Sequence, residues 1–187
     1  MTHPREVLLG AQAGAVSLPV CDHYSGVEVR MRKSLQQANP AARVAVRVHP
    51  VDHPCFEADV STIVGRAGAH VRHVMVPKVE SPADVVVAAA ALDRAGHPEL
   101  PLHVLVESPA AVHRAFDIAA HPRVQSISFG LMDFVSAHAG AIPASGMGVA
   151  GQFTHPLVVR AKLEIASACH AHGKVPSHCV VTEFSDT

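Results

Sequence analysis

The sequence has 187 residues, a length that suits one domain with a substantial core. Its formal net charge is −1 and its aromatic content is 4%, which argues against a protein that binds a nucleic-acid backbone or stacks bases. No uninterrupted apolar run approaches the roughly 20 residues that span a bilayer, and the N-terminus lacks the layout of a signal peptide. We therefore expect a cytoplasmic protein with reduced cysteines and with no membrane or nucleic-acid partner.

Short apolar runs alternate along the chain with longer amphipathic segments. The apolar runs predict strands, in chain order, at residues 15–20, 43–48, 73–76, 102–106 and 124–129, with a weaker sixth near 174–181. Pro176 counts against a long ladder in the sixth strand. The amphipathic segments between the strands predict helices at residues 27–37, 57–66, 82–95, 109–120 and 155–171.

Capping residues mark the ends of three of these helices. Ser81-Pro82 and Ser108-Pro109 each predict a helix start, with serine as the N-cap and proline at the first helical position. Gly173 predicts the C-terminal end of the last helix. Residues 140–152 (GAIPASGMGVAGQ) form one long stretch without a regular pattern, and their place after a strand indicates an active-site loop.

Alternation of strands and helices without hairpin signals predicts parallel βαβ units. A barrel of eight such units needs about 250 residues, so this chain has room for about six. Two architectures are compatible with that count: an open doubly wound sheet, and an eightfold (β/α) barrel from which pieces are missing. No linker or block of charge indicates a second domain.

Polar residues follow four successive strands, at the carboxyl ends where parallel α/β folds place their sites. They are Arg47 in VAVRVHP, Lys78 and Glu80 in VMVPKVE, Glu107 after LHVLV, and Asp133 in SISFGLMD. Two carboxylates from adjacent strands are a typical protein contribution to Mg²⁺, and a guanidinium binds a carboxylate in bidentate fashion. Such a set suits a 2-oxo acid chelated to the metal during carbon–carbon cleavage. The alternative is a buried ion-pair network or a set of helix caps.

The segments VRVHP, VMVPKVES, LHVLVESPAAV and ISFGLMDF follow one another in this order. With them, the chain resembles the HpcH/HpaI aldolase and citrate lyase β-subunit family, and within it the stand-alone CoA-ester lyases acting on malyl-CoA or citramalyl-CoA. The resemblance implies a TIM-type (β/α)8 barrel in which Arg47 contacts the substrate carboxylate. It also implies that Glu107 and Asp133 hold Mg²⁺, that Lys78 lies near the site, and that the protein is a homo-oligomer, by analogy a trimer.

The chain departs from the family pattern in two places. Family members carry an acidic strand motif of the D-x-E-D type before the V-R-V strand, whereas KSLQQANPAARVAVRV passes directly from helix to strand. Family members also continue past the point that corresponds to Thr187, into a segment that in several relatives lends a catalytic acid or base to a neighbouring subunit. We therefore expect residues 1–187 to form a single, incomplete barrel domain with about six βα units, lacking one early unit and the C-terminal segment.

Three further residues follow strands and could contact a substrate. Asp22 and His23 come after the first strand, and His49 follows Arg47 at the end of the second. The alternative is that these residues are helix caps or ordinary loop residues. The spacing of a zinc site is missing from the cluster Cys169, His170, His172, His178 and Cys179.

These residues and the resemblance lead to one main hypothesis. We expect a Mg²⁺-dependent carbon–carbon lyase that cleaves a 3-hydroxyacyl-CoA, of the malyl-CoA or citramalyl-CoA type, to acetyl-CoA and a 2-oxo acid. The general base is unassigned. Two alternatives are a metal-dependent aldolase acting on free hydroxy-oxo acids and a catalytically inert member of the family.

Overall fold

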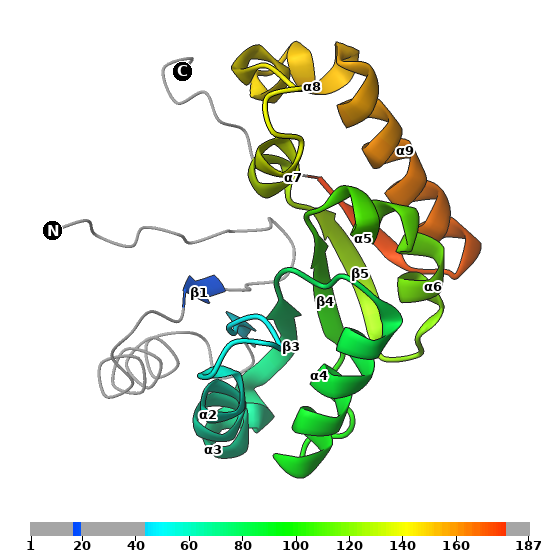
Figure 1. The fold of residues 1–187 in the computed structure, drawn as a ribbon. Coiled ribbons are helices and arrows are strands. Elements are labelled where there is room, and N and C mark those ends of the chain that lie inside the picture. Colours follow the sequence, from blue (N-terminus) through cyan, green and yellow to red (C-terminus); the bar gives the residue numbers. More distant parts are fainter. Residues whose placement is uncertain (1–16, 20–43, 179–187) are drawn as a thin grey trace, which may run out of the picture. The chain divides into compact units, whose positions relative to one another are not determined.

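The computed structural model describes residues 17–19 and 44–178 (Figure 1). The predicted helix at residues 27–37 and the candidate residues Asp22 and His23 lie outside the described residues. The chain divides into two compact units: a first unit of residues 1–77 and 86–102, and a second unit of residues 78–85 and 103–187.

The sheet of the first unit consists of parallel strands that lie in chain order: β1 (Ser17–Pro19), β2 (Val44–Arg47) and β3 (Val71–Val76). β2 ends at Arg47, whose partner in the ladder is Met75. The strand predictions at residues 43–48 and 73–76 are confirmed, although β3 begins at Val71. Val46 and Val74 are buried almost completely, as expected for strands that are covered on both faces.

The connection from β2 to β3 is helical (Figure 1). Its helix type changes along its length. It consists of α2 (Phe56–Asp59), a π-helix (Val60–Val64), α3 (Gly65–Ala67) and a 3₁₀ turn (Gly68–His70). The sequence predicted one regular helix at residues 57–66. Four of the five residues of the π-helix, VSTIV, are β-branched. Such side chains crowd the preceding helical turn and weaken the regular α-helix.

The strands of the second unit are also neighbours in chain order: β4 (Leu102–Val106, its first residue in the first unit), β5 (Val124–Phe129) and β6 (Val175–Ser177). All five residues of β4 are buried, which explains why the sequence predicted its bounds correctly. β5 and β6 pair in parallel, with Ser128 opposite Ser177. β6 has only three residues, in agreement with the expectation that Pro176 prevents a long ladder.

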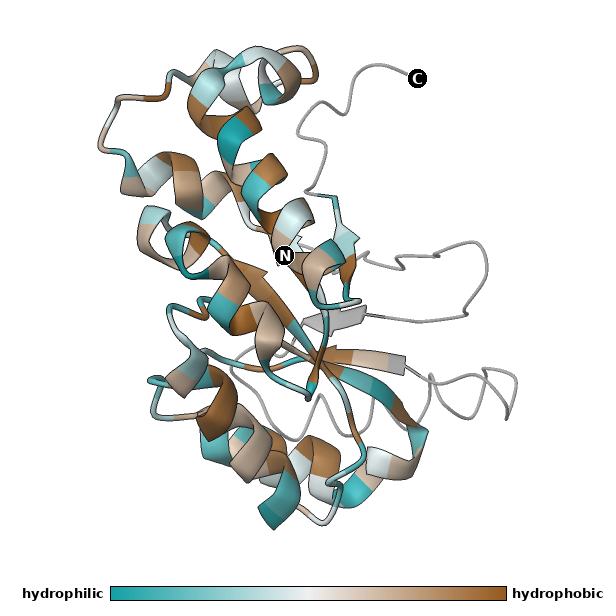
Figure 2. Cartoon of the chain, turned by 90° about the vertical axis from the view of Figure 1, so that its right-hand side faces the viewer, coloured by the Kyte–Doolittle hydropathy of each residue, from teal (hydrophilic) through white to brown (hydrophobic). Residues whose placement is uncertain are grey.

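Helices alternate with these strands: α4 (Pro82–Arg94, divided between the units), α5 (Pro109–His113), α6 (Ala115–Ala120), α7 (Leu131–Ala137), a 3₁₀ turn (Ala144–Met147), α8 (Gly151–Thr154) and α9 (Pro156–Ala171). α9 buries Val158, Ala161 and Ile165, which share one helical face. Figure 2 shows the resulting bands of hydrophobic and hydrophilic residues along the helices. The predicted α/β class with parallel strands is confirmed.

Capping residues fix two helix ends as predicted. The Ser108 hydroxyl oxygen accepts the amide of Ala111 at 3.0 Å, at the start of α5. Gly173 has φ +65°, and the amide of Lys174 donates to the carbonyl of Cys169 at 2.7 Å. This six-residue closure after α9 is the Schellman pattern, in which glycine tolerates the left-handed backbone.

Other helix boundaries differ from the prediction. The predicted helix at residues 109–120 is interrupted at Arg114, which has φ −98° and ψ 11°. α7 was not predicted, and the stretch at residues 140–152 contains a 3₁₀ turn and the start of α8. The start of α4 at Pro82 agrees with the prediction; there the Asp84 carboxylate accepts the amide of Ser81 at 2.9 Å, as the fourth residue of a capping box does. None of the helices in the described part of the chain has the length and apolar composition of a membrane span.

Candidate active site

Glu107 is a buried carboxylate of the second unit. It directly follows β4 and is 6% exposed. Its Oε2 atom accepts the backbone N–H of Lys78 at 2.9 Å. Because a buried carboxylate is costly unless it is hydrogen-bonded, this amide stabilises Glu107 in its position at the carboxyl end of the strand.

The residue that donates this hydrogen bond has an unusual backbone. Lys78 has φ +53°, a left-handed conformation that costs a non-glycine residue roughly 1–3 kcal/mol. The next residue, Val79, donates its amide to the carbonyl of Leu105 at 3.2 Å, which ties this segment to β4. The strained turn thus directs the Lys78 amide at Glu107, whereas the side chain of Lys78 is exposed.

Gly130 makes room for the Glu107 carboxylate. It follows β5, and its amide donates to the carbonyl of Val106 at 2.9 Å. A Cβ atom built on Gly130 would overlap the end of the Glu107 side chain and would lie 2.8 Å from its Cδ atom. Gly130 was not among the site residues predicted from the sequence, although a glycine placed directly after a buried strand is a recognisable signal of close approach.

Asp133 lies in the first turn of α7, three residues after Gly130, and its side chain is exposed. Glu107 and Asp133 therefore present one buried and one exposed carboxylate on consecutive strand–helix connections of the second unit. Oxygen donors of this kind fit Mg²⁺, which keeps several waters and needs only one or two protein carboxylates. Among the described residues, no group of three or more His, Cys, Asp or Glu side chains is arranged to hold a metal ion.

Glu80 belongs to a second hydrogen-bonded group beside this site. Its carboxylate accepts the hydroxyl of Ser108 at 2.5 Å, and its carbonyl accepts Nη1 of Arg114 at 3.2 Å. Ser108 is also the N-cap of α5. The Ser108 hydroxyl is thus engaged on both sides, as donor to Glu80 and as acceptor from the helix, which is a structural role.

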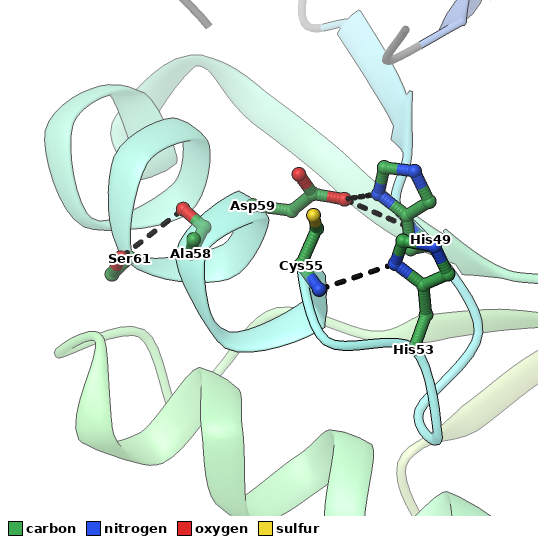
Figure 3. Close-up of polar contacts among 6 residues, drawn as sticks. All are labelled: His49, His53, Cys55, Ala58, Asp59 and Ser61. Carbon is green, nitrogen blue, oxygen red and sulfur yellow. Dashed lines mark hydrogen bonds and ion pairs between the residues drawn. The ribbon is translucent and has the colours of Figure 1, made fainter. Parts of the chain in front are cut away.

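Arg47 and His49 lie in the first unit, at and just after the end of β2. The side chain of Arg47 is exposed. Figure 3 shows His49 beside Asp59, whose Oδ2 atom lies 2.9 Å from the His49 amide and 2.6 Å from its Nδ1 atom. Asp59 is fully buried. Asp59 was not among the site residues predicted from the sequence, because its position in a helical pattern gives no sign of this contact.

Cys169 is a buried thiol in α9. Burial raises the pKa of the Cys169 thiol, and a thiol that stays protonated is a poor metal ligand.

Known proteins are similar to this chain in sequence and in fold. An L-malyl-CoA/beta-methylmalyl-CoA lyase from Cereibacter sphaeroides is 30% identical in an alignment 161 residues long, and the match covers 76% of this chain and 49% of the lyase. A citrate lyase structure from Burkholderia xenovorans LB400 is 40% identical, with a TM-score of 0.81, and the match covers 92% of this chain and 57% of the other. The chain spans about half the length of the curated relatives it matches.

A third match is similar in fold. The citrate lyase β subunit from M. tuberculosis, complexed with oxaloacetate and magnesium, has a TM-score of 0.69 at 22% identity and covers 92% of this chain and 71% of that protein. The model of the HpcH/HpaI aldolase/citrate lyase family matches residues 27–184, a range that contains all four motifs with Arg47, Lys78, Glu107 and Asp133. The chain belongs to the HpcH/HpaI aldolase/citrate lyase family.

Proposed function

We propose that this chain is a Mg²⁺-dependent carbon–carbon lyase that cleaves a 3-hydroxyacyl-CoA of the malyl-CoA or citramalyl-CoA type. The products are acetyl-CoA and a 2-oxo acid. The observation that supports this proposal best is the buried Glu107 carboxylate, held by the Lys78 amide against Gly130 at the end of β4. The similarity to the malyl-CoA lyase supports the substrate class.

The complete fold in this proposal is the TIM-type (β/α)8 barrel, in which residues 1–187 contribute about six units to a single domain. The parallel, chain-ordered strands within each unit support it, since the strands of a barrel follow one another in this way. The similarity in fold to the citrate lyase from Burkholderia xenovorans LB400 also supports it. The homo-oligomer expected from the family stays a prediction, which size-exclusion chromatography with light scattering would test.

Glu107 and Asp133 are the residues that would hold Mg²⁺. When bound, the ion supplies positive charge for the keto and carboxylate oxygens of the 2-oxo acid product. The hydrogen bond from Lys78 keeps the Glu107 oxygen in a fixed direction, as the groups around metal-binding carboxylates commonly do. Because Gly130 has no side chain, Glu107 occupies this position without displacing the backbone.

Arg47 would bind the substrate carboxylate through its guanidinium group and steady the charge that develops during cleavage. Its exposure at the end of β2 leaves the guanidinium available for such a contact. Lys78 would act near the reacting atoms, and Asp22, His23 and His49 would contact the substrate. These roles rest on the family resemblance and on the position of each residue after a strand.

A second candidate is an aldolase that acts on free hydroxy-oxo acids. The related citrate lyase β subunit that was complexed with oxaloacetate and magnesium holds a free 2-oxo acid, which favours this candidate. It uses the same carboxylates and Arg47 but needs no contact with the CoA moiety. Parallel assays with the thioester and with the corresponding free acid distinguish the two.

The test is the release of acetyl-CoA from malyl-CoA and citramalyl-CoA by the purified chain, with Mg²⁺ and with EDTA. We expect release that depends on Mg²⁺. Replacing Glu107 by Gln should lower kcat by at least about 100-fold, because one charged ligand is lost from the metal site, and should weaken Mg²⁺ binding in a titration. Glu57→Gln is the matched control, since Glu57 is exposed and pairs with Arg94 on the surface. Full activity of the Glu107 variant would contradict the assignment of the site.

A further inference from the structure

A histidine–aspartate pair lies at the carboxyl end of β2 in the first unit (Figure 3). His49 comes two residues after the end of β2, and Asp59 is the last residue of α2. The backbone amide of His49 and its Nδ1 atom both contact Oδ2 of Asp59, at 2.9 and 2.6 Å. One carboxylate oxygen therefore fixes both the backbone and the ring of His49.

These contacts favour a proton on Nδ1 of the ring. Oδ2 accepts the backbone N–H of His49, and an ionised Asp59 carboxylate also accepts the N–H of Nδ1. The proton of a neutral His49 is then on Nδ1, and the Nε2 atom keeps its lone pair. The free lone pair is on the side of the ring that points away from Asp59 (Figure 3).

The burial of Asp59 makes this pair electrostatically strong. The Asp59 side chain is completely buried, and its Oδ1 atom has no hydrogen-bond partner in the described part of the chain. The hydrogen bonds that the described residues make to the Asp59 carboxylate thus come from His49. A proton taken up at Nε2 would create an imidazolium directly opposite a buried carboxylate, where the attraction between opposite charges is stronger than in water.

The ring of His49 is held but still accessible. It is 19% exposed and stacks on His53, with 4.1 Å between the ring centroids and 8° between the ring planes. His53 is itself fixed, because its Nδ1 atom accepts the amide of Cys55 at 3.1 Å. The imidazole therefore has one face packed, one nitrogen bonded and one nitrogen open, as expected for a group that exchanges a proton.

We infer that His49 is the proton acceptor for the hydroxyl group of the substrate and that Asp59 is its positioning residue. This inference rests on the proposed function. In the cleavage reaction, Nε2 of His49 takes the proton from the 3-hydroxyl group of the acyl thioester. The O–H electrons form the carbonyl of the 2-oxo acid, the adjacent carbon–carbon bond breaks, and its electrons form the enolate of acetyl-CoA. The enolate carbon takes up one proton, which balances the proton that His49 removes.

The first test compares His49→Ala with the wild-type chain in the Mg²⁺-dependent release assay. We expect kcat to fall by about 100-fold or more, with KM and Mg²⁺ affinity almost unchanged. Added imidazole should restore part of the lost kcat in proportion to its concentration, a rescue that a purely structural histidine would not show. His70→Gln is the matched control, since His70 is an exposed histidine of the same unit and its replacement should leave kcat unchanged.

The second variant, Asp59→Asn, removes the charge but keeps the shape. The side-chain oxygen of Asn can accept both N–H groups of His49 at the place of Oδ2, so only the electrostatic contribution is lost. We expect kcat to fall about 10-fold or more with little change in KM.

A third measurement is independent of catalysis. Long-range ¹H–¹⁵N NMR spectra of the wild-type chain should show His49 protonated on Nδ1. Protonation on Nε2 instead would overturn the proposed pair, whether or not the chain is active. An active wild type with an equally active His49→Ala variant would overturn this inference alone. A wild type that cleaves neither the thioesters nor the free acids would overturn the proposed function and this inference together.

Discussion

The contact between Gly130 and Glu107 allows the position of the carboxylate to be changed while Glu107 itself is kept. In Gly130→Ala, the new Cβ atom would lie 2.8 Å from Cδ of Glu107 and would overlap the neighbouring side-chain atoms. The end of a glutamate side chain can move away, but then Oε2 leaves the Lys78 amide, which it contacts at 2.9 Å. The substitution thus removes a hydrogen bond to a buried charge without changing any ionisable residue.

Loss of such a bond costs about 1.5–3 kcal/mol, because hydrogen bonds to charged groups contribute roughly this much. We expect the free energy of unfolding in urea to fall by this amount. Mg²⁺ affinity should fall at least about tenfold, which corresponds to roughly 1.4 kcal/mol, because the carboxylate loses its fixed direction. Urea denaturation and isothermal titration with Mg²⁺ measure the two effects.

Gly65→Ala is the control for this experiment. Gly65 lies at the start of α3 with φ −59°, and a Cβ atom there meets nothing within 4 Å. Alanine at this position should leave Mg²⁺ binding unchanged and should leave stability unchanged or increase it by up to about 1 kcal/mol, because alanine favours helix. A Gly130 variant that matches this control in both stability and Mg²⁺ affinity would refute the reasoning about Glu107.

Two further predictions concern stability. Ser108→Ala removes the N-cap that accepts the Ala111 amide. It should lower the free energy of unfolding in urea by about 0.5–2 kcal/mol. Ser61→Ala changes an exposed helical serine and should have a smaller effect in the same titration. Burial, followed by the charge of Arg72, lowers the pKa of His73. His73 therefore binds a proton more readily in the unfolded chain than in the folded one. Its contribution to the free energy of unfolding is present above pH 6.5 and is lost as the pH falls below 6.5. In urea titrations at several pH values, the free energy of unfolding of His73→Gln should fall less on acidification than that of the wild-type chain. An equal dependence on pH in both chains would contradict the role given to His73.

The elements that the sequence predicted well are those with a strong local signal. β4 and β5 were predicted with their observed bounds: all five residues of β4 are buried, and the buried residues of β5 are the apolar Val124, Ile127 and Phe129. Ser108 and Gly173 marked helix ends because capping depends on one or two neighbouring residues. The break at Arg114 and the π-helix after α2 have no equally strong local signal, so a single helix was predicted in each place.

The candidate site shows the same limit. Glu107, Lys78 and Asp133 could be selected from their places after strands, and the structure shows the contact between the first two. The sequence could not show that the contact uses the backbone of Lys78, because the left-handed conformation results from packing of this segment against β4. Asp59 was missed for a similar reason: its partner is ten positions away, and nothing in the helical pattern distinguishes a carboxylate that turns inward.

The backbone origin of the hydrogen bond to Glu107 has an evolutionary consequence. Every amino acid except proline has an amide hydrogen, so the side chain at position 78 can change without loss of this donor. The left-handed backbone at Lys78 restricts the choice by conformation instead, with glycine and asparagine tolerated best and β-branched residues worst. Relatives could therefore vary the chemistry of the side chain at this position while keeping the direction of the carboxylate constant.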